Sequence, residues 1–441
     1  MQTDAVNWGI LPTVGDYDVV VCGAGPAGLG AALAAGRAGA RTLLVERQFC
    51  VGGMASCTGI NTWCDTPGGA IFDELFDRLE ALGKARRHWN PEGHLHPPGR
   101  AVLHGETLKA VAVEMLQEAG VDLLLGATAA GARVERSTVN AVLLATKGGL
   151  CLAPAKVVID CTADADVAAL AGAEFSVGDP DDGRIMHVNF MFQLGGIDGD
   201  AYEAARPSAR QMLDRIEEAR RRGGLRPPKG VFRPAPDTFP YNSSEDTLAL
   251  NYWEIEGVDC SDPLQVSATL TDCYCRALEV VRFCREYLPG HERCALTRFW
   301  EVLGTRESRR LKGRATVTGD DLLAGRTFPD GIASACFFID FHDSPPGRTI
   351  PYDLDFKVRN SPPAGEYYEI RYGCLLPVNL GGLLVAGRCI SADRPALASL
   401  RVMPTCMYLG QAAGTAAAMA VQGGIGPEEV PGEEVKARVM G

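Results

Sequence analysis

The feature that most limits the fold of this sequence is a glycine turn between a strand and a helix near the N-terminus. Residues 18–22 (DVVVC) are apolar and largely β-branched, which favours a buried strand. The turn GAGPAG at 23–28 follows, then an alanine-rich stretch that favours a helix, and a second apolar strand at 42–45 ends at Glu46. Strand, glycine turn, helix, strand and acid in this order are typical of a βαβ dinucleotide-binding unit.

The glycines and the acid of that unit each have a physical task. Gly23 permits the tight turn, Gly25 lets the backbone approach a pyrophosphate, and Gly28 lets the helix pack closely on the strand. The helix N-terminus offers free N–H groups to the phosphates. Glu46 lies 18 residues past Gly28, where a carboxylate can accept hydrogen bonds from ribose hydroxyls. The alternative is a purely structural glycine turn, and the motif alone does not separate FAD from NAD.

The segments that follow favour FAD. Gly52-Gly53 stand a few residues beyond Glu46, where flavoproteins run their backbone alongside the ribityl chain and the isoalloxazine. Short strands are predicted at 128–134 and 139–145, and a buried strand at 156–160 leads into Cys161-Thr162-Ala163. This meander and strand resemble the two-dinucleotide-binding-domain flavoproteins, whose usual sequence after the strand is Ala-Thr-Gly.

The C-terminal part predicts a second contact with the same cofactor. A strand at 381–386 is followed by Gly387-Arg388, and a helix dense in small residues has Pro404 in its first turn. The positive end of that helix could face the flavin C2 carbonyl and stabilise negative charge on reduced flavin. Gly410 and Gly414 would let the helix pack tightly. The alternative is a plain buried helix.

These blocks together resemble the bacterial FAD-dependent oxidoreductase family, distantly related to fumarate reductase-type flavoproteins. GTRESRRLKG, FIDFHD, IPY, AGRCIS, RVMPTC and GQAAG follow the GAGPAG unit in the family's order, and the resemblance runs from Asp18 to about Gly424. The family implies an α/β fold: a Rossmann-like FAD-binding domain built from 1–180 and 346–441, with an inserted α+β substrate domain at 181–345. Asp393-Arg394-Pro395 departs from many relatives, which carry a small residue and a histidine there.

The residues expected to bind FAD come from both ends of the chain. They are Gly23, Gly25, Pro26, Ala27, Gly28, Glu46, Arg47, Gly52, Gly53, Met54, Ala129, Thr162, Asp164, Gly387, Arg388, Arg401, Pro404, Thr405 and Gly410.

The inserted region has its own predicted elements. A strand is expected at 187–194, an exposed charged helix at 202–222 and a proline-rich irregular stretch at 225–242. A long helix begins with Ser261 or Asp262 as its cap and runs to about residue 288.

His342 is the first candidate for catalysis, as an acid or base. Asp340-Phe341-His342 closes an apolar run, so the imidazole could emerge at a strand end, with Asp340 on the same side by the two-residue strand period. The alternative is a structural histidine. Arg306 could clamp an anionic substrate or balance reduced flavin, although an ion-pair network with Glu307 is an equal alternative. Arg401 has the same two interpretations, and Tyr352 is a proton donor of lower rank.

The fifteen cysteines predict neither a disulfide framework nor a metal site. Their number is odd and the sequence contains no C-x2-C pair, so a zinc ribbon fits badly. Cys50 and Cys57 flank Gly52-Gly53, but their C-x6-C spacing differs from the C-x4-C of disulfide oxidoreductases. Most thiols should be buried, and a redox or covalent-flavin role stays open for Cys50, Cys57 and Cys64.

Composition excludes several partners and compartments. The 441 residues suggest two to three domains at about 150 residues each. A net charge of −12 without long basic runs argues against nucleic acid. No secretory signal or membrane span is recognisable, so a cytoplasmic location is expected. Oligomeric state, including a homo-oligomer, stays open.

Three functions remain at this stage. The preferred one is a dehydrogenase or oxidase that moves hydride from a small-molecule C–H to flavin N5 while His342 removes a proton from an adjacent O–H or N–H. The second is reduction of an activated C=C in a carboxylate substrate, and the third is an FAD-bearing electron-transfer subunit. The sequence has a single strand-GxGxxG-helix unit, which favours a separate electron acceptor or donor such as O2, a quinone or a redox protein.

Overall fold

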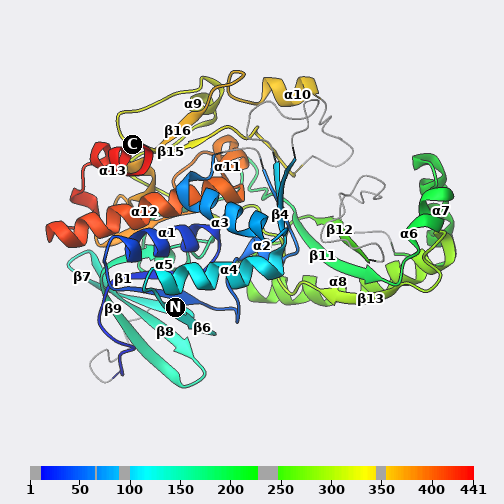
Figure 1. The fold of residues 1–441 in the computed structure, drawn as a ribbon, viewed down its shortest axis with the longest axis horizontal. Helices are drawn as coiled ribbons and strands as arrows, with labels where there is room; N and C mark the ends of the chain where they lie inside the picture. The colour runs from blue at the N-terminus through cyan, green and yellow to red at the C-terminus, as the bar shows by residue number, and fades with distance from the viewer. Residues whose placement is uncertain (1–10, 65–66, 89–99, 227–246, 344–353) are drawn as a thin grey trace. The chain divides into compact units, whose positions relative to one another are not determined.

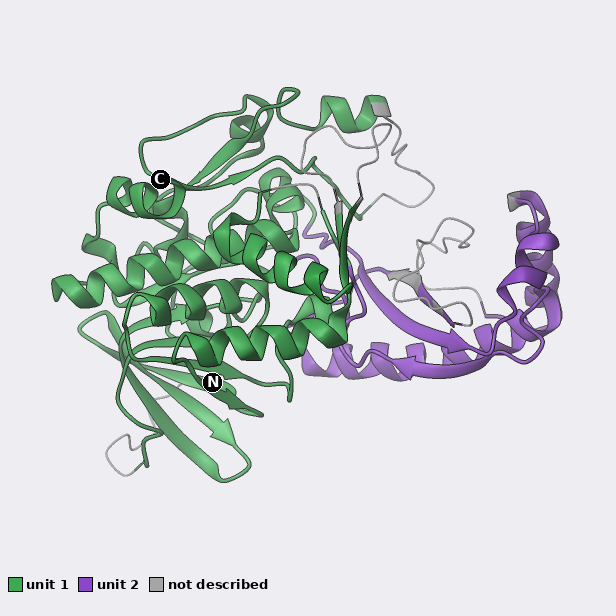
Figure 2. Cartoon of the chain, in the orientation of Figure 1, with its two compact units in different colours: residues 1–56, 62–182, 309–441 green, residues 57–61, 183–308 purple. Residues whose placement is uncertain are grey.

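The computed structural model of the chain describes residues 11–64, 67–88, 100–226, 247–343 and 354–441 (Figure 1). The chain divides into two compact units, which Figure 2 shows in different colours. Unit 1 comprises Met1–Ser56, Thr62–Asp182 and Arg309–Gly441, and unit 2 comprises Cys57–Asn61 and Gly183–Ser308. Unit 1 is thus discontinuous in the sequence, and its segments come from both ends of the chain.

A parallel sheet forms the centre of unit 1. Its strand order is β6-β2-β1-β9-β17, where the strands are Asp122–Leu125, Thr42–Glu46, Tyr17–Cys22, Gly149–Asp160 and Leu383–Val385. All five residues of β2 and all three of β17 are buried, as expected for parallel strands covered on both faces. The predicted Rossmann-like fold class is confirmed.

Strand β9 belongs to two sheets at once. Its first half pairs antiparallel with β8 (Thr138–Thr146), which pairs with β7 (Thr128–Glu135), whereas its second half pairs parallel with β1 and β17. One twelve-residue strand thus joins the predicted three-stranded meander to the dinucleotide-binding sheet. The short α5 (Asp166–Leu170) begins six residues after the end of β9.

Helices α1 (Pro26–Arg37) and α12 (Met403–Gly423) pack backbone to backbone (Figure 1). A Cβ on Gly410 would overlap the carbonyl oxygen of Ala27, and a Cβ on Gly414 would overlap that of Ala31. The pairing of 27 with 410 and 31 with 414 shows that the helices run in the same direction. Seven residues of α12 precede Gly410, so its N-terminus extends about 10 Å beyond the first turn of α1.

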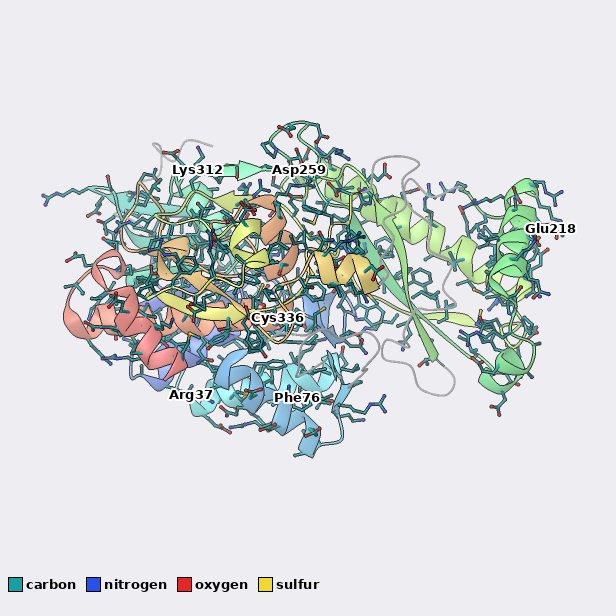
Figure 3. The ribbon with its side chains drawn as sticks, turned by 90° about the horizontal axis from the view of Figure 1, so that it is seen from above. Arg37, Phe76, Glu218, Asp259, Lys312 and Cys336 are labelled. Atoms are coloured by element: carbon teal, nitrogen blue, oxygen red, sulfur yellow. The ribbon has the colours of Figure 1, made fainter. Side chains whose placement is uncertain are left out.

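Unit 1 also contains further α-helices and paired strands. They are α2 (Met54–Cys57), α3 (Gly69–Ala81), α4 (Gly105–Glu118), α9 (Gly319–Leu323), α10 (Leu354–Arg359), α11 (Arg394–Leu400), α13 (Gly432–Met440), and the paired strands β3 (Thr62–Trp63), β5 (Arg100–Leu103), β4 (Ala85–His88), β10 (Phe175–Val177), β14 (Arg309–Leu311), β15 (Gly331–Ala335) and β16 (Tyr368–Arg371). Figure 3 labels Arg37 at the end of α1, where it forms a 2.6 Å ion pair with Glu74 of α3. This pair ties α3 to α1.

Unit 2 is a three-stranded antiparallel sheet with helices. The strand order is β12-β11-β13, with bounds Thr247–Ile255, Val188–Gly195 and Ala295–Phe299. Helix α8 (Pro263–Tyr287) begins at Asp262, whose carboxylate accepts from the backbone N–H of Leu264, so the predicted long helix is confirmed. Figure 3 labels Glu218 on a further helix of this unit.

The prediction of one continuous helix over 202–222 is wrong. Two helices, α6 (Gly199–Ala204) and α7 (Ala209–Arg221), occupy the region. Pro207 disfavours helical backbone in the preceding residue, and Ser208 starts α7 by a capping box with Gln211. The irregular stretch predicted at 225–242 lies largely outside the described residues.

The inserted unit also ends earlier than the sequence indicates. It ends at Ser308 rather than at 345. The physical reason is strand pairing: β14 pairs with β10, and β15 pairs with β16, so residues from Arg309 onward pack within unit 1.

All fifteen cysteines are free thiols, and ten of them are buried. Burial raises the pKa of the Cys273 thiol to about 12, so that side chain is uncharged at neutral pH. Cys57 is buried, and Cys50 and Cys64 are partly exposed. Among the residues that the structure describes, no helix combines the length and the apolar character needed to cross a membrane.

Candidate cofactor and active site

The glycine turn is tight at two of its positions and open at the third. Gly23 has φ +98°, and a Cβ there would overlap the Cys161 carbonyl oxygen at the end of β9. A Cβ on Gly28 would overlap the carbonyl oxygen of Gly23. A Cβ on Gly25, by contrast, would meet only the Cα of Gly53, at 3.8 Å. Space for a ligand therefore exists at Gly25, before the first turn of α1.

Glu46 is held rigidly at the end of β2. Its Oε2 accepts from the Ala24 N–H at 2.7 Å and its Oε1 from the Gln48 N–H at 2.8 Å. The side chain is buried next to the glycine turn, since Gly23 N–H also donates to the Val45 carbonyl at 2.7 Å. Each carboxylate oxygen keeps a further lone pair that could accept from a hydroxyl.

Asp160 organises the turn that follows β9. Its carboxylate accepts from Thr162 N–H at 3.0 Å, from Thr162 Oγ1 at 2.6 Å and from Ala168 N–H at 2.8 Å. Burial raises the pKa of Asp160 to about 6, although these hydrogen bonds act in the opposite direction. Sequence analysis did not single out this residue; the signal was an acid closing the apolar run at 156–160.

Two alanines in this turn adopt left-handed backbone. Ala163 has φ +72° and Ala165 has φ +53°. Ala163 stands where the flavoproteins named above carry glycine, so the protein keeps the glycine conformation at an alanine. A left-handed conformation costs a non-glycine residue about 1 kcal/mol.

We therefore expect Ala163→Gly to raise the free energy of unfolding by about 0.5 to 1 kcal/mol, because glycine adopts φ +72° without strain. Urea unfolding of the wild type and the variant measures the difference. Ala168→Gly, in the helical backbone of α5, is the matched control and should destabilise by a similar amount. Equal destabilisation by both substitutions would contradict the strain at Ala163.

Arg388 and Asp164 form a buried ion pair beside α1. Arg388 Nη2 lies 2.6 Å from Asp164 Oδ1, and the side chains are 9% and 12% exposed. Gly387 places this pair near the first turn of α1, because a Cβ on Gly387 would lie 3.3 Å from the Ala27 Cβ. Arg388 Nε is buried and has no hydrogen-bond partner among the described residues. A buried donor without a partner is costly, and this one is suited to an anionic ligand.

His342, Asp340 and Arg401 form a second charged group. His342 Nε2 lies 3.0 Å from Asp340 Oδ2, and Arg401 Nη2 donates to the same oxygen at 3.1 Å and to the Asp340 carbonyl at 2.9 Å. Arg401 stands two residues before α12 begins. The strand predicted to carry His342 is wrong: β15 ends at Ala335, so the contact with Asp340 arises in irregular backbone rather than from strand periodicity.

A second arginine holds the other end of the same segment. Arg394 Nη2 lies 2.6 Å from Asp343 Oδ2, and its Nη1 lies 3.0 Å from Asp179 Oδ2. Arg394 is the first residue of α11, and Arg401 follows its last residue. The two ends of this helix therefore place Arg394 against Asp343 and Arg401 against Asp340. Asp393 caps α11 by accepting from the Ala396 N–H at 2.8 Å. The Asp-Arg-Pro departure noted in the sequence is thus the start of this helix.

The other predicted site residues fall in several places. Arg306 belongs to unit 2, where its Nη1 donates to the His187 carbonyl at 2.6 Å, whereas His342 and Asp340 belong to unit 1. Glu307 accepts from the Met186 N–H at 2.9 Å. Tyr352 lies outside the described residues. The cofactor candidates comprise Arg47 after β2, Met54 at the start of α2, Ala129 on β7, and Pro404 and Thr405 in the first turn of α12.

Comparison with solved structures finds partial likenesses at low sequence identity. A geranylgeranyl bacteriochlorophyll reductase-like protein from Thermoplasma acidophilum is 12% identical, with a TM-score of 0.47 over 96% of this chain and 83% of that one. The OxyS anhydrotetracycline hydroxylase from Streptomyces rimosus is 15% identical, with a TM-score of 0.46 over 97% of this chain and 65% of that one. The myxobacterial chondrochloren halogenase CndH is 13% identical, with a TM-score of 0.45 over 96% and 78%. Likenesses at this level carry no information on the reaction.

No curated protein matches the sequence. The family model of the FAD dependent oxidoreductases, in contrast, matches residues 18–439, which is nearly the whole chain. The glycine turn, the buried acid at the end of β2 and the two helices packed through glycine all lie within that match. The chain therefore belongs to the FAD-dependent oxidoreductase family and is a flavoprotein that uses FAD.

Proposed function

We propose that this oxidoreductase oxidises a small molecule at a C–H bond next to an O–H or N–H, with His342 as the base that takes the proton. FAD, when bound, supplies the acceptor for the hydride, at flavin N5. The observation that carries the proposal is the group formed by His342, Asp340 and Arg401, of which Arg401 stands two residues before α12.

Residues of both chain ends fit FAD. The opening at Gly25 and the N–H groups of the first turn of α1 suit the diphosphate, and the unpartnered Arg388 Nε offers it a further donor. Glu46 suits the adenosine ribose. Helix α12 begins about 10 Å beyond the first turn of α1, and its positive end suits the flavin ring.

Asp340 and Arg401 prepare His342 for proton transfer. If Nε2–H donates to Asp340, the proton-accepting lone pair of the imidazole is on Nδ1. The contact with Asp340 holds the imidazole ring in one orientation. Arg401 fixes the orientation of Asp340 through two contacts, one to its side chain and one to its backbone. Arg394 holds Asp343, so the segment that bears His342 is restrained on both sides.

Electrons must leave the protein by a separate route. The sequence contains one dinucleotide-binding glycine turn, and FAD occupies it in this proposal. We therefore propose O2, a quinone or a redox protein as the acceptor.

Anaerobic mixing of the oxidised holoenzyme with sets of small alcohols and amines tests the reaction. Loss of the visible absorbance of oxidised flavin on the addition of one class is the expected result. Reoxidation of pre-reduced enzyme by an enoate, without any bleaching by alcohols or amines, would instead favour reduction of a C=C bond. Inertness to all of these, with electron exchange to a protein partner, would favour an electron-transfer subunit.

A further inference from the structure

Phe49 is the most exposed large apolar side chain among the described residues. Its side chain is 86% exposed, and it stands three residues past Glu46. The next value among large apolar side chains is 79%, for Leu264 in unit 2. A single exposed apolar residue is ordinary on a protein surface, so exposure alone assigns nothing.

The position of Phe49 is nevertheless fixed by its neighbours. Gly126 N–H donates to the Gln48 carbonyl, and Ala127 N–H donates to the Glu46 carbonyl, both at 3.1 Å. The ring also lies against Gly126, since a Cβ there would be 2.6 Å from Phe49 Cε1. The aromatic ring is therefore held at the edge of the sheet, with most of its surface uncovered.

We infer that Phe49 is the stacking platform for the adenine of FAD. Glu46 suits the ribose hydroxyls, and adenine is attached directly to that ribose, so the base must lie within a few ångströms of the Glu46 carboxylate. Glu46 pairs with Leu125 in the sheet, so the segments leaving this edge are residues 47–49 and 126–129. Phe49 is the aromatic residue in these two segments.

Stacking on Phe49 accounts for an exposed ring that would otherwise contact water. A base presents a flat π-face to an aromatic side chain, and the stacking energy depends little on the identity of the base. Arg47 and Gln48, the other residues between Glu46 and Phe49, offer no aromatic surface. Phe49 thus supplies affinity for the adenine end of FAD, while Glu46 and Arg388 supply polar contacts.

Binding of three probes to apoprotein tests this role without any substrate. We expect Phe49→Ala to raise the Kd for FAD and for ADP about tenfold, because both contain adenine. The Kd for FMN, which lacks adenine, should not change. Phe49→Trp should restore tight binding of FAD and ADP. Leu264→Ala removes a similarly exposed side chain from unit 2 and should leave all three affinities unchanged. Isothermal titration calorimetry measures each Kd.

Three results would overturn the inference. The first is wild-type affinity of Phe49→Ala for FAD and ADP, and the second is an equal loss of affinity for FMN. The third is a changed oligomeric mass of Phe49→Ala in analytical ultracentrifugation with unchanged ADP binding, which would assign Phe49 to a subunit contact. The inference rests on the FAD site proposed above, and Gly25→Ala separates the two failures. If Gly25→Ala weakens FAD binding and Phe49→Ala does not, only the stacking role fails. If neither weakens it, the proposed site fails as well.

Discussion

Gly28→Ala is expected to destabilise the protein by about 3 kcal/mol or more and to abolish FAD retention. The added methyl would overlap the Gly23 carbonyl oxygen, and Gly23 cannot move aside because its N–H donates to Val45 at 2.7 Å. Relief of the overlap requires α1 to shift away from β1, which also displaces the helix N-terminus from the diphosphate. Urea unfolding and the flavin content of the purified protein measure the two effects.

Gly25→Ala is the matched control in the same turn. Gly25 has φ −73°, which alanine adopts without strain, and its Cβ would lie 3.8 Å from the nearest atom, the Gly53 Cα. We expect wild-type stability of the apoprotein together with a loss of FAD affinity of about tenfold to a hundredfold, because the methyl occupies the approach of the diphosphate. Wild-type FAD affinity would contradict the proposed diphosphate position, and wild-type stability of Gly28→Ala would contradict the contact at Gly23.

His342→Ala is expected to slow reduction of the bound flavin by substrate about 100-fold to 10,000-fold, which is the range for loss of a general base. The FAD content should stay at the wild-type level, because the substitution leaves Gly25, Glu46 and Arg388, which are proposed to hold FAD, in place. Anaerobic stopped-flow mixing with the alcohol or amine that bleaches the wild type measures the rate.

His342→Gln separates proton transfer from packing. Glutamine can still donate to Asp340 Oδ2 but cannot serve as a base near neutral pH. A loss equal to that of His342→Ala is therefore expected. Recovery of most of the rate by glutamine would assign His342 a structural role, and an unchanged rate in His342→Ala would remove it from the reaction. Loss of FAD together with activity would place His342 in cofactor binding.

Local elements of the fold were predictable because their signals lie within a few residues. The glycine turn at 23–28 predicts β1 and α1, since Gly23 and Gly28 stand where a Cβ would overlap backbone. Asp262 and Pro263 predict the start of α8 by capping chemistry. The failures also have local causes. Pro207 and Ser208 divide the helix expected at 202–222, and the apolar residues after β15 are buried without forming a strand.

The charged groups of the site were not predictable as groups. Asp340 and Arg401 are 61 residues apart, Asp343 and Arg394 are 51 apart, and Asp164 and Arg388 are 224 apart. Single charged residues at such separations carry no periodicity or capping signal that joins them. The pairing depends on α11 and on the strand order β1-β9-β17, which brings the ends of β9 and β17 together.

The sequence by itself determined the cofactor class and the strand-turn-helix that is proposed to receive it, because a glycine turn against a dinucleotide is a local requirement of backbone geometry. Only the tertiary structure decided which charged side chains form ion pairs. Ion pairs form only after the sheet and helices have packed, and burial then makes each partner necessary to the other. For that reason the FAD site could be outlined from residue types and spacing, whereas the contacts of Arg401 with Asp340 and of Arg394 with Asp343 could be found only in the folded chain.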